Sequence, residues 1–305
     1  MKLSAVISTY NSAHVIKECL ESLSFADEIV VVDHESKDET VRIARKYTKH
    51  IFSQPNDPQK IDLQKNYGFT KAKGDWILSL DADERIPKEL ADEIRRIISS
   101  SGGYAAYKIP RKNIIFNKWI EHSIWWPDLQ LRLFEKGKGK YEASKVHQDL
   151  KVEGTIGELT QPMLHENYQT ISQYLQKMDV YTENEANAYL AQNSHFIWVD
   201  AIRIPVRDFL KTFFLQEGYK DGFHGLVLSI LQGFYMFLVI TKVWEKQGFR
   251  EENPDSFLRT LAAEFETLYK EITYWFLTSL SHVSKNPMEK ISYKFKRKIV
   301  SSKLK

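Results

Sequence analysis

The sequence WILSLDAD at residues 76–83 is a short apolar run that ends in two carboxylates, Asp81 and Asp83. Such a run predicts a buried strand, and ligands of open α/β sheets bind where such strands end. Because side chains two residues apart in extended backbone point the same way, both carboxylates can face one ion. Hard oxygen ligands of this kind suit Mg²⁺ or Mn²⁺ that carries a diphosphate. The alternative is a polar junction in which Asp83 or Glu84 caps the helix that Pro87 begins.

The segments before this stretch alternate between apolar runs and helical patterns. Each predicted strand is followed by a predicted helix, and the second strand ends at Asp33. The strands are expected at 3–8, 28–32 and 50–52, and the helices at 12–23, 39–47 and 60–73. The first helix has Asn11 or Ser12 as its cap, and Ser36 with Glu39 matches a capping box for the second. This alternation predicts an α/β fold with a mostly parallel, mixed sheet flanked by helices.

The segments after the acidic strand are more varied. A helix is predicted from Pro87 to about Ser100, strands at 104–109 and 129–134, and a further helix at 172–189. The loop at 116–127 carries Trp119, Trp125 and Trp126. Because aromatic rings bury large areas wherever they pack, these side chains are either core anchors or a platform whose faces stack on sugar rings.

The sequence pattern changes near residue 200, after which apolar and aromatic helical segments follow one another. This change predicts a first domain at 1–200 and a helical region at 201–305. Residues 225–241 carry no charge. We expect one of three arrangements for this segment: docked on the protein, lying in a membrane interface or spanning a membrane. From residue 285 onward, eight Lys and Arg side chains face one acid, Glu289. Such a tail is either a solvated end or a segment that is attracted to anionic lipid.

The composition is that of an ordinary globular protein. Of its 305 residues, 43% are hydrophobic and 13% aromatic, which is enough for a substantial core. The formal net charge of +3 is too small to indicate a nucleic-acid partner. One cysteine, Cys19, excludes an internal disulfide and fits a reducing compartment. No secretory signal precedes the first strand, so we expect a cytoplasmic location.

Several motifs in this chain resemble those of family 2 glycosyltransferases, in the same order. They are VISTYN at 6–11, VVVD at 30–33, QKNYG at 64–68 and LDAD at 80–83. Further motifs are similar to the subgroup of lipopolysaccharide-core β-1,4-glucosyltransferases. These are WPD at 126–128, QLRLF at 130–134, VH at 146–147, PMLH at 162–165 and GYKDGFHG at 218–225. The resemblance implies a GT-A fold, a nucleotide-diphospho-sugar donor, in this case a UDP-sugar, and an inverting mechanism.

The resemblance also implies roles in donor binding. Thr9, Tyr10 and Asn11 would line the nucleotide pocket. Asp33 would accept hydrogen bonds from uracil or ribose, with a strand-end cap as the alternative. Arg132 would pair with a donor or acceptor phosphate, and its alternative is a salt bridge that anchors the strand.

Further positions would serve the diphosphate and the metal ion. Lys65 and Asn66 would lie near the base and the diphosphate, although Lys65 by itself is more typical of a solvated helix lysine. Asp81 would lie near ribose and metal, and Asp83 would be the direct ligand of Mn²⁺ or Mg²⁺. His165 would reach the diphosphate or metal, with a structural role as the alternative.

An inverting transfer needs one base that takes the proton of the attacking acceptor hydroxyl. Where the subgroup commonly has His-Glu, this chain has His147 and Gln148, and glutamine is not a useful base. Asp149 takes the role, or Asp128 acts as base or as the group that orients the acceptor, or the protein binds donor without efficient transfer. We favour an active enzyme with Asp149 and Asp128 as candidates.

The leading hypothesis is a metal-dependent glycosyltransferase that acts on a cell-envelope glycoconjugate at the inner face of the cell membrane. Its partners would be a nucleotide sugar, a glycolipid or glycan acceptor and, peripherally, anionic membrane. One alternative is a polyprenyl-phosphate glycosyltransferase, which predicts a basic acceptor pocket. The other is a donor-binding protein whose transfer is impaired by Gln148.

Overall fold

The computed structural model describes residues 1–58, 60–100, 103–142, 150–192, 197–251 and 253–302. The chain forms two compact units. The first unit consists of Met1–Glu121 with Trp125–Gln173, and the second of His122–Ile124 with Tyr174–Lys305. Along the chain, the first unit passes into the second between residues 173 and 174. A domain boundary at residue 200 remains a prediction from sequence.

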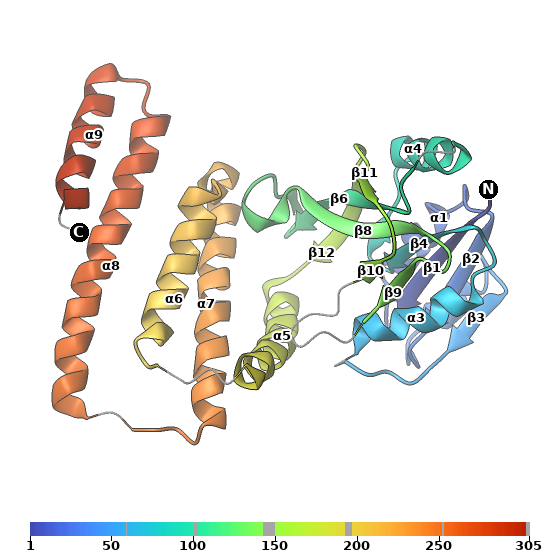
Figure 1. The fold of residues 1–305 in the computed structure, drawn as a ribbon, viewed down its shortest axis with the longest axis horizontal. Helices are drawn as coiled ribbons and strands as arrows, with labels where there is room; N and C mark the ends of the chain where they lie inside the picture. The colour runs from blue at the N-terminus through green and yellow to red at the C-terminus, as the bar shows by residue number, and fades with distance from the viewer. Residues whose placement is uncertain (59, 101–102, 143–149, 193–196, 252, 303–305) are drawn as a thin grey trace. The chain divides into compact units, whose positions relative to one another are not determined.

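The first half of unit one is a parallel sheet in the order β3-β2-β1-β4 (Figure 1). Its strands are β1 (Leu3–Thr9), β2 (Glu28–Asp33), β3 (His50–Ser53) and β4 (Trp76–Asp81). The connecting helices are α1 (Ile16–Glu21), α2 (Thr40–Ala44) and α3 (Ile61–Lys71), and α4 (Lys88–Ser99) follows β4. All four strands run in the same direction, so their carboxyl ends meet at one edge.

The sheet continues past β4 with mixed pairing. Strand β8 (Asp128–Glu135) is antiparallel to β4 and to β6 (Ala106–Ile115), and β12 (Met163–Tyr168) is parallel to β6. Short strands complete the pairing: β5 (Glu84–Arg85) on β12, β7 (Lys118–Trp119) and β11 (Ile156–Glu158) on β6, and β9 (Gly139–Tyr141) with β10 (Leu150–Val152). The predicted α/β class with a mostly parallel, mixed sheet and flanking helices is confirmed, although these short strands were not predicted.

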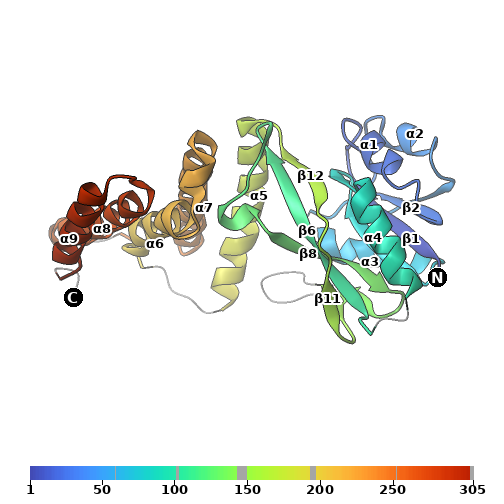
Figure 2. The same ribbon diagram turned by 90° about the horizontal axis from the view of Figure 1, so that it is seen from above.

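The two faces of the parallel strands bury separate clusters. Alternate side chains such as Leu3, Ile7 and Leu78 pack with α1 and α4 on one face. Val6 and its neighbours pack with α3 on the other. A Cβ added to Gly68 of α3 would lie 2.6 Å from Val6 Cγ1, so glycine allows α3 to approach the sheet closely. Figure 2 shows α3 and α4 from above.

The predicted capping box at residues 36–39 is wrong. Helix α2 begins only at Thr40, and Glu39 makes no cap to its backbone. Ser36 Oγ instead accepts from Asn11 N at 2.8 Å, and Asp38 Oδ1 accepts from Thr40 N at 3.0 Å. These polar side chains stabilise the loops at the carboxyl ends of β1 and β2 rather than a longer helix.

Unit two is helical in the part of the chain that the structure describes. Its elements are most of α5 (Ile171–Ala191), α6 (Asp200–Leu210), a π-helical turn (Lys211–Leu215), a 3₁₀ turn (Gly218–Asp221), α7 (Phe223–Lys246), α8 (Pro254–Val283) and α9 (Pro287–Ser302). The 3₁₀ turn η1 (Ser123–Trp125) brings residues 122–124 into this unit, where Ser123 N donates to Gln216 O at 2.8 Å.

Helix α7 is long and apolar enough to cross a membrane by length and composition. In this structure it is docked on α6 and the two short turns. Gly233 faces the backbone oxygen of Pro205, and Gln232 donates to Asp208 Oδ2 at 2.9 Å. Lys242 pairs with Asp179 of α5 at 2.8 Å. These contacts show how α7 packs within unit two, and the three arrangements predicted for residues 225–241 remain predictions.

Candidate active site

Three predicted site residues end three neighbouring strands at the carboxyl edge of the sheet. Thr9 is paired with Asp33 across β1 and β2, and Ser8 is paired with Asp81 across β1 and β4. Parallel pairing without a register shift places these side chains at the same edge because each strand ends at the same level. This is the edge at which open α/β sheets bind ligands.

Thr9 and Asp33 are buried there with unused acceptor atoms. Thr9 is 3% exposed and Asp33 4% exposed. One carboxylate oxygen of Asp33 accepts from Ser36 N at 3.1 Å, whereas its Oδ1 and Thr9 Oγ1 have no hydrogen-bond partner among the residues that the structure describes. Since buried polar atoms are normally paired, these two atoms point to a polar ligand.

The residues that follow Thr9 form the rim of this edge. Tyr10 is exposed, and Asn11 has a positive φ of 47°. Asn11 Oδ1 accepts from Lys37 N at 2.8 Å, which ties the loop after β1 to the loop after β2. Asn11 therefore shapes the rim through its backbone conformation and its bond to Lys37.

Asp81 is paired with two cations. Its Oδ1 lies 2.8 Å from Lys65 Nζ, and its Oδ2 lies 2.6 Å from an amino group of Arg132. Burial alone would raise the pKa of Asp81, but the charges of Lys65 and Arg132 hold it well below its usual value. Lys65 is 4% exposed, so the interpretation of Lys65 as a solvated helix lysine is wrong.

The backbone after Asp81 does not stay extended. Strand β4 ends at Asp81, residues 82 and 83 form a turn, and Glu84 Oε2 accepts from Asp81 N at 3.0 Å. The argument that Asp81 and Asp83 point the same way in extended backbone therefore fails, because the carboxylate of Glu84 holds a tight turn. Asp81 contacts Lys65 and Arg132, whereas Asp83 lies beside His165.

Glu84 is the buried centre of a charged network. It is fully buried, and its Oε1 lies 2.7 Å from Arg132 and 3.3 Å from Arg111. It does not cap α4, whose N-terminus has no side-chain cap. Sequence reasoning missed Glu84 and Arg111 as members of the site. The available signal was the pair Arg111 and Asn113 in β6, two polar residues that share one face of a strand otherwise rich in buried positions.

Asp128 is held by donors on both oxygens. Arg111 Nε donates to its Oδ2 at 2.7 Å and Asn113 Nδ2 at 3.0 Å, and Gln130 Nε2 donates to its Oδ1 at 2.5 Å. Burial alone would raise the pKa of Asp128, but Arg111 and the amide donors hold it below its usual value. A carboxylate with three contacts of this kind is a weak proton acceptor and a firm anchor.

His165 is oriented by a buried asparagine. Asn113 Nδ2 donates to Trp125 O at 2.9 Å and to Asp128, so its Oδ1 is the atom that faces His165 Nδ1 at 2.7 Å. Nδ1 therefore carries the hydrogen, and Nε2 lies 3.5 Å from Asp83 Oδ2.

The donor set fits a divalent cation with two protein ligands. Among the residues that the structure describes, no group of three or more His, Cys, Asp or Glu side chains could hold a metal ion. Asp83 and His165 form a pair, and the hydrogen bond from His165 to Asn113 is the usual support of a metal-binding histidine. Mg²⁺ and Mn²⁺ commonly take their remaining ligands from a diphosphate and water.

Other predicted residues have different surroundings. Asn66 uses its amide on the backbone of Tyr141, to which it donates at 2.8 Å and from which it accepts at 2.9 Å. It therefore ties α3 to β9, and its role near the base and the diphosphate remains a prediction. Arg132 is in the salt bridge with Asp81 and Glu84. Asp149 and Gln148 lie outside the described residues.

The three tryptophans of the loop at 116–127 are half-buried. Trp119 and Trp126 meet edge to face with ring centres 5.5 Å apart, and Lys112 Nζ lies 3.9 Å from the ring centre of Trp119. Trp125 packs edge to face against Tyr168 at 6.3 Å. Each ring thus has an aromatic partner, as core anchors do, and keeps an exposed part that could stack on a sugar.

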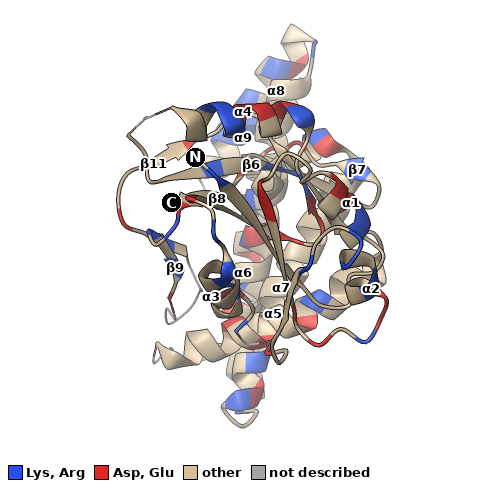
Figure 3. Ribbon diagram, turned by 90° about the vertical axis from the view of Figure 1, so that its right-hand side faces the viewer, with Lys and Arg blue, Asp and Glu red and all other residues tan. Residues whose placement is uncertain are grey.

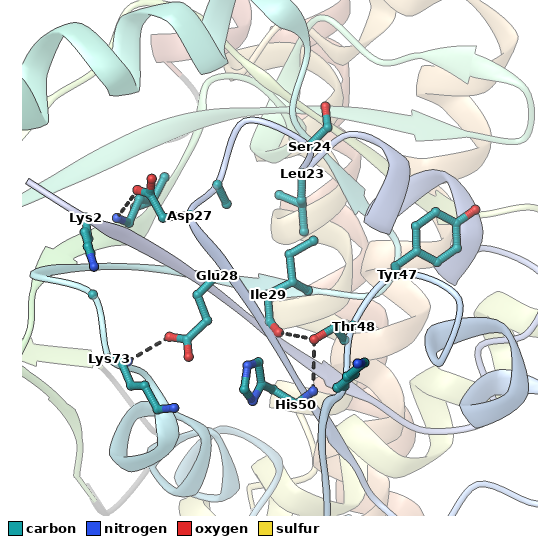
Figure 4. A pocket seen from close by; sticks show the side chains of 14 residues that line it. Lys2, Leu23, Ser24, Asp27, Glu28, Ile29, Tyr47, Thr48, His50 and Lys73 are labelled. Atoms are coloured by element: carbon teal, nitrogen blue, oxygen red, sulfur yellow. Dashed lines mark hydrogen bonds between the residues drawn. The ribbon is translucent and has the colours of Figure 1, made fainter.

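A cavity of about 750 Å³ lies elsewhere, at the amino ends of β1, β2 and β3. Figure 4 shows Glu28, Lys73, Thr48 and His50 around it. Its polar groups are engaged in the fold, since Glu28 Oε2 accepts from Lys73 N at 2.7 Å and Thr48 Oγ1 donates to Ile29 O at 2.7 Å. Figure 3 shows acidic and basic residues interspersed on α4 and α8, without a surface of one sign there.

Comparison with known proteins identifies the family. The family model described as glycosyl transferase family 2 matches residues 4–150. An uncharacterized glycosyltransferase of Rickettsia bellii (strain RML369-C) is 30% identical over 257 residues, 80% of this chain and 86% of the relative. The lipopolysaccharide core biosynthesis glycosyltransferase LpsC of Rhizobium meliloti (strain 1021) is 24% identical over 255 residues, 82% of this chain and 94% of the relative.

Among solved structures, S. aureus TarS 1–349 in complex with UDP-GlcNAc is similar, with a TM-score of 0.41 and 16% identity over 81% of this chain and 92% of that chain. The match to the Rickettsia relative spans most of both proteins, and the family model covers the strands that carry Thr9, Asp33 and Asp81. This chain belongs to glycosyl transferase family 2.

Proposed function

We propose that this protein is an inverting glycosyltransferase that moves a sugar from a UDP-sugar to a glycan of the cell envelope, such as a lipopolysaccharide core. Family membership supports the reaction class, and the similarity to LpsC supports the acceptor class. The observation that carries the proposal is the edge of the sheet where the unpartnered acceptors of Thr9 and Asp33 accompany the carboxylates of Asp81 and Asp83.

The donor would bind through its nucleotide first. Asp33 Oδ1 and Thr9 Oγ1 would receive hydrogen bonds from the uracil or the ribose, and the exposed ring of Tyr10 would cover the base. The loop that Asn11 shapes closes this side of the pocket. Both unused buried atoms would thereby gain partners, which favours binding because a buried unpaired acceptor costs about 1–3 kcal/mol.

The diphosphate would lie beyond the end of β4. Asp83 and His165 would hold a divalent cation there, and when bound this cation stabilises the negative charge that builds on the leaving diphosphate. Lys65 and Arg132 neutralise Asp81, so that this carboxylate orients the site without repelling the donor. Asp81 in this proposal supports the metal site from beside it and is not a direct ligand.

The acceptor proton would go to Asp149, the acid that follows Gln148. Asp128 is the weaker base because donors saturate its carboxylate and lower its pKa, so we assign it the orientation of the acceptor side. Trp125 and Trp126, which keep exposed parts, would stack on the acceptor sugars. Asp149→Asn should reduce transfer by orders of magnitude and leave donor affinity unchanged.

The test is slow hydrolysis of a panel of UDP-, GDP- and dTDP-sugars in the presence of Mn²⁺. We expect UDP-sugars to be hydrolysed, EDTA to stop the reaction, and Asp83→Asn to lower the rate at least about a hundredfold. The matched control is Asp92→Asn on the exposed face of α4, which should leave the rate unchanged. Equal hydrolysis by Asp83→Asn and wild type, or absence of nucleotide binding, would refute the proposal.

The reaction would take place at the cytoplasmic face of the cell membrane, where a glycolipid acceptor is accessible. Many large apolar side chains are exposed on the helices of unit two, and the chain ends in a basic segment.

A further inference from the structure

Helices α8 and α9 form an antiparallel pair joined by a short link (Figure 1). The residues of α9 that are half-buried in this pair are Lys290, Tyr293, Arg297, Val300 and Ser301. The guanidinium of Arg297 lies over the ring of Tyr274 in α8, 5.9 Å from its centre. Helix α9 thus contacts α8 through a face that is mostly polar.

The apolar face of α9 is the one exposed to solvent. Met288 is 75% exposed, Ile291 64%, Phe295 66% and Ile299 44%. Spacings of three and four residues place these side chains within roughly 80° of one another around the helix, and roughly opposite the face that packs on α8. A helix of a globular protein normally buries such a stripe. Helix α9 instead presents its apolar side to solvent and its mostly polar side to α8.

The charges beside this apolar face indicate its occupant. Exposed Lys294 and Lys298 lie on one flank, and exposed Lys296 lies on the other. Residues 285–302 contain six Lys and Arg against the single acid Glu289. A second copy of the same face would bring these lysines together, whereas an anionic surface neutralises them. Lysine stems also reach up from an apolar layer to place their ammonium groups among headgroups.

We infer that the face of α9 formed by Met288, Ile291, Phe295 and Ile299 docks on an anionic lipid bilayer. The helix lies in the plane of the interface, with Phe295 at the boundary between headgroups and acyl chains and the lysines among the headgroups. The inference deepens the proposed location at the membrane face and is independent of the sugar and the donor.

The test is flotation of the full-length protein with lipid vesicles, in the absence of any donor. Vesicles of equal parts phosphatidylcholine and phosphatidylglycerol should bind the protein, and vesicles of phosphatidylcholine alone should bind it at least about tenfold more weakly. Phe295→Glu should weaken binding to the anionic vesicles at least about tenfold, because a carboxylate enters the apolar layer. Lys294→Gln and Lys298→Gln should each weaken it about fivefold.

The matched control is Phe223→Glu, which changes an equally exposed phenylalanine, 76% exposed, at the start of α7. It should bind vesicles as wild type does. The inference is overturned if Phe295→Glu binds like wild type, if neutral vesicles bind equally well, or if Phe223→Glu loses binding to the same extent. Self-association of the wild type without vesicle binding, lost in Phe295→Glu, would also overturn it and assign the face to a second copy. Hydrolysis of a soluble donor by Phe295→Glu, measured in parallel, separates failure of this inference from failure of the proposed function.

Discussion

At the scale of single residues, the site consists of charges that balance one another inside the protein. Asp81, Glu84 and Asp128 are paired with Lys65, Arg132 and Arg111 in a continuous chain of contacts. Removing one partner from a buried ion pair costs more than the pair itself contributes, because the remaining charge is left without compensation.

Glu84→Gln should therefore destabilise the protein strongly. The change leaves Arg132 and Arg111 without the carboxylate that both contact, and we expect a loss of about 3 kcal/mol in the free energy of unfolding. Urea denaturation followed by tryptophan fluorescence measures it. Glu158→Gln, on the exposed side of β11, is the control and should change the midpoint little. A midpoint for Glu84→Gln equal to that of the control would contradict the charged network.

Asn113→Ala should weaken metal binding although Asn113 is not itself a proposed metal ligand. His165 would lose the acceptor that keeps its hydrogen on Nδ1, so Nε2 would no longer be held toward Asp83. We expect the Mn²⁺ concentration for half-maximal hydrolysis of the donor to rise about 10–100-fold. Asn167→Ala removes a neighbouring buried asparagine that lies 3.3 Å from Asn113, and it should have a small effect. If both variants need the same Mn²⁺ as wild type, Asn113 does not orient His165.

At the scale of secondary-structure elements, glycines set how closely helices approach their neighbours. Gly225 of α7 faces the backbone oxygen of Gly218, and an added Cβ would lie 1.8 Å from it. The obstacle is backbone, which cannot rotate away as a side chain can. Helix α7 therefore depends on Gly225 for its position on the 3₁₀ turn.

Gly225→Ala should lower the thermal stability of the helical unit. Overpacking of this kind costs about 1–3 kcal/mol or more, even though alanine favours helix more than glycine does. The helical circular dichroism signal during heating is the measurement. Ser292→Ala on the exposed side of α9 adds helix propensity without a clash and should not lower the melting temperature. An unchanged melting temperature for Gly225→Ala would mean that α7 does not rest on the turn at Gly218.

Elements with a strong pattern were predictable, and elements defined by tertiary contacts were not. The runs before Thr9, Asp33 and Asp81 are apolar because both faces of their strands are buried, and the sequence shows this directly. Strand β5 has two residues, Glu84 and Arg85, and exists because β12 pairs with it. No local pattern encodes such a pairing, so the turn after Asp81 was taken for extended backbone.

At the scale of the whole molecule, the core isolates the chain's one thiol. Cys19 in α1 is fully buried, and burial together with the nearby acids Glu84, Asp83 and Asp81 raises its pKa far above the usual value. Since the thiolate is the reactive species, the folded protein should not react with a thiol-specific chromogenic disulfide at pH 8 (an ordinary working pH near the usual thiol pKa of about 8.5).

The measurement is the absorbance of the released chromophore in buffer and in concentrated urea. One equivalent should be released in urea, where Cys19 is exposed, and almost none in buffer. Because the chain has a single cysteine, no second thiol complicates the result. Rapid release from the native protein would show that α1 opens readily and that the core around Cys19 is not as closed as described.

The sequence was informative about the residues that we propose for the donor and less so about those that we propose for the acceptor. Thr9, Asp33 and Asp81 follow strands whose pattern is unambiguous, so their common edge could be predicted. Asn113 and Arg111 come from β6, which joins the sheet through pairing with β8 and β12, and their proximity to Asp128 and His165 arises only from that pairing. From sequence alone these two polar residues resemble surface positions, whereas in the structure Asn113 is buried and Arg111 is half-buried.

A chain of charged side chains runs from Asp128 through Arg111, Glu84 and Arg132 to Asp81. It connects the residue that we propose for the acceptor side with the one that we propose for the donor side. In a low-dielectric interior, a change of charge at one end alters the field at the other with little screening. We therefore predict that substitutions at Asp128 and Asp81 are thermodynamically coupled, so that their energies do not add. In the proposed function, a sugar acceptor that engages Asp128 would change the contact between Arg132 and Asp81, and each substrate would thereby influence the binding of the other.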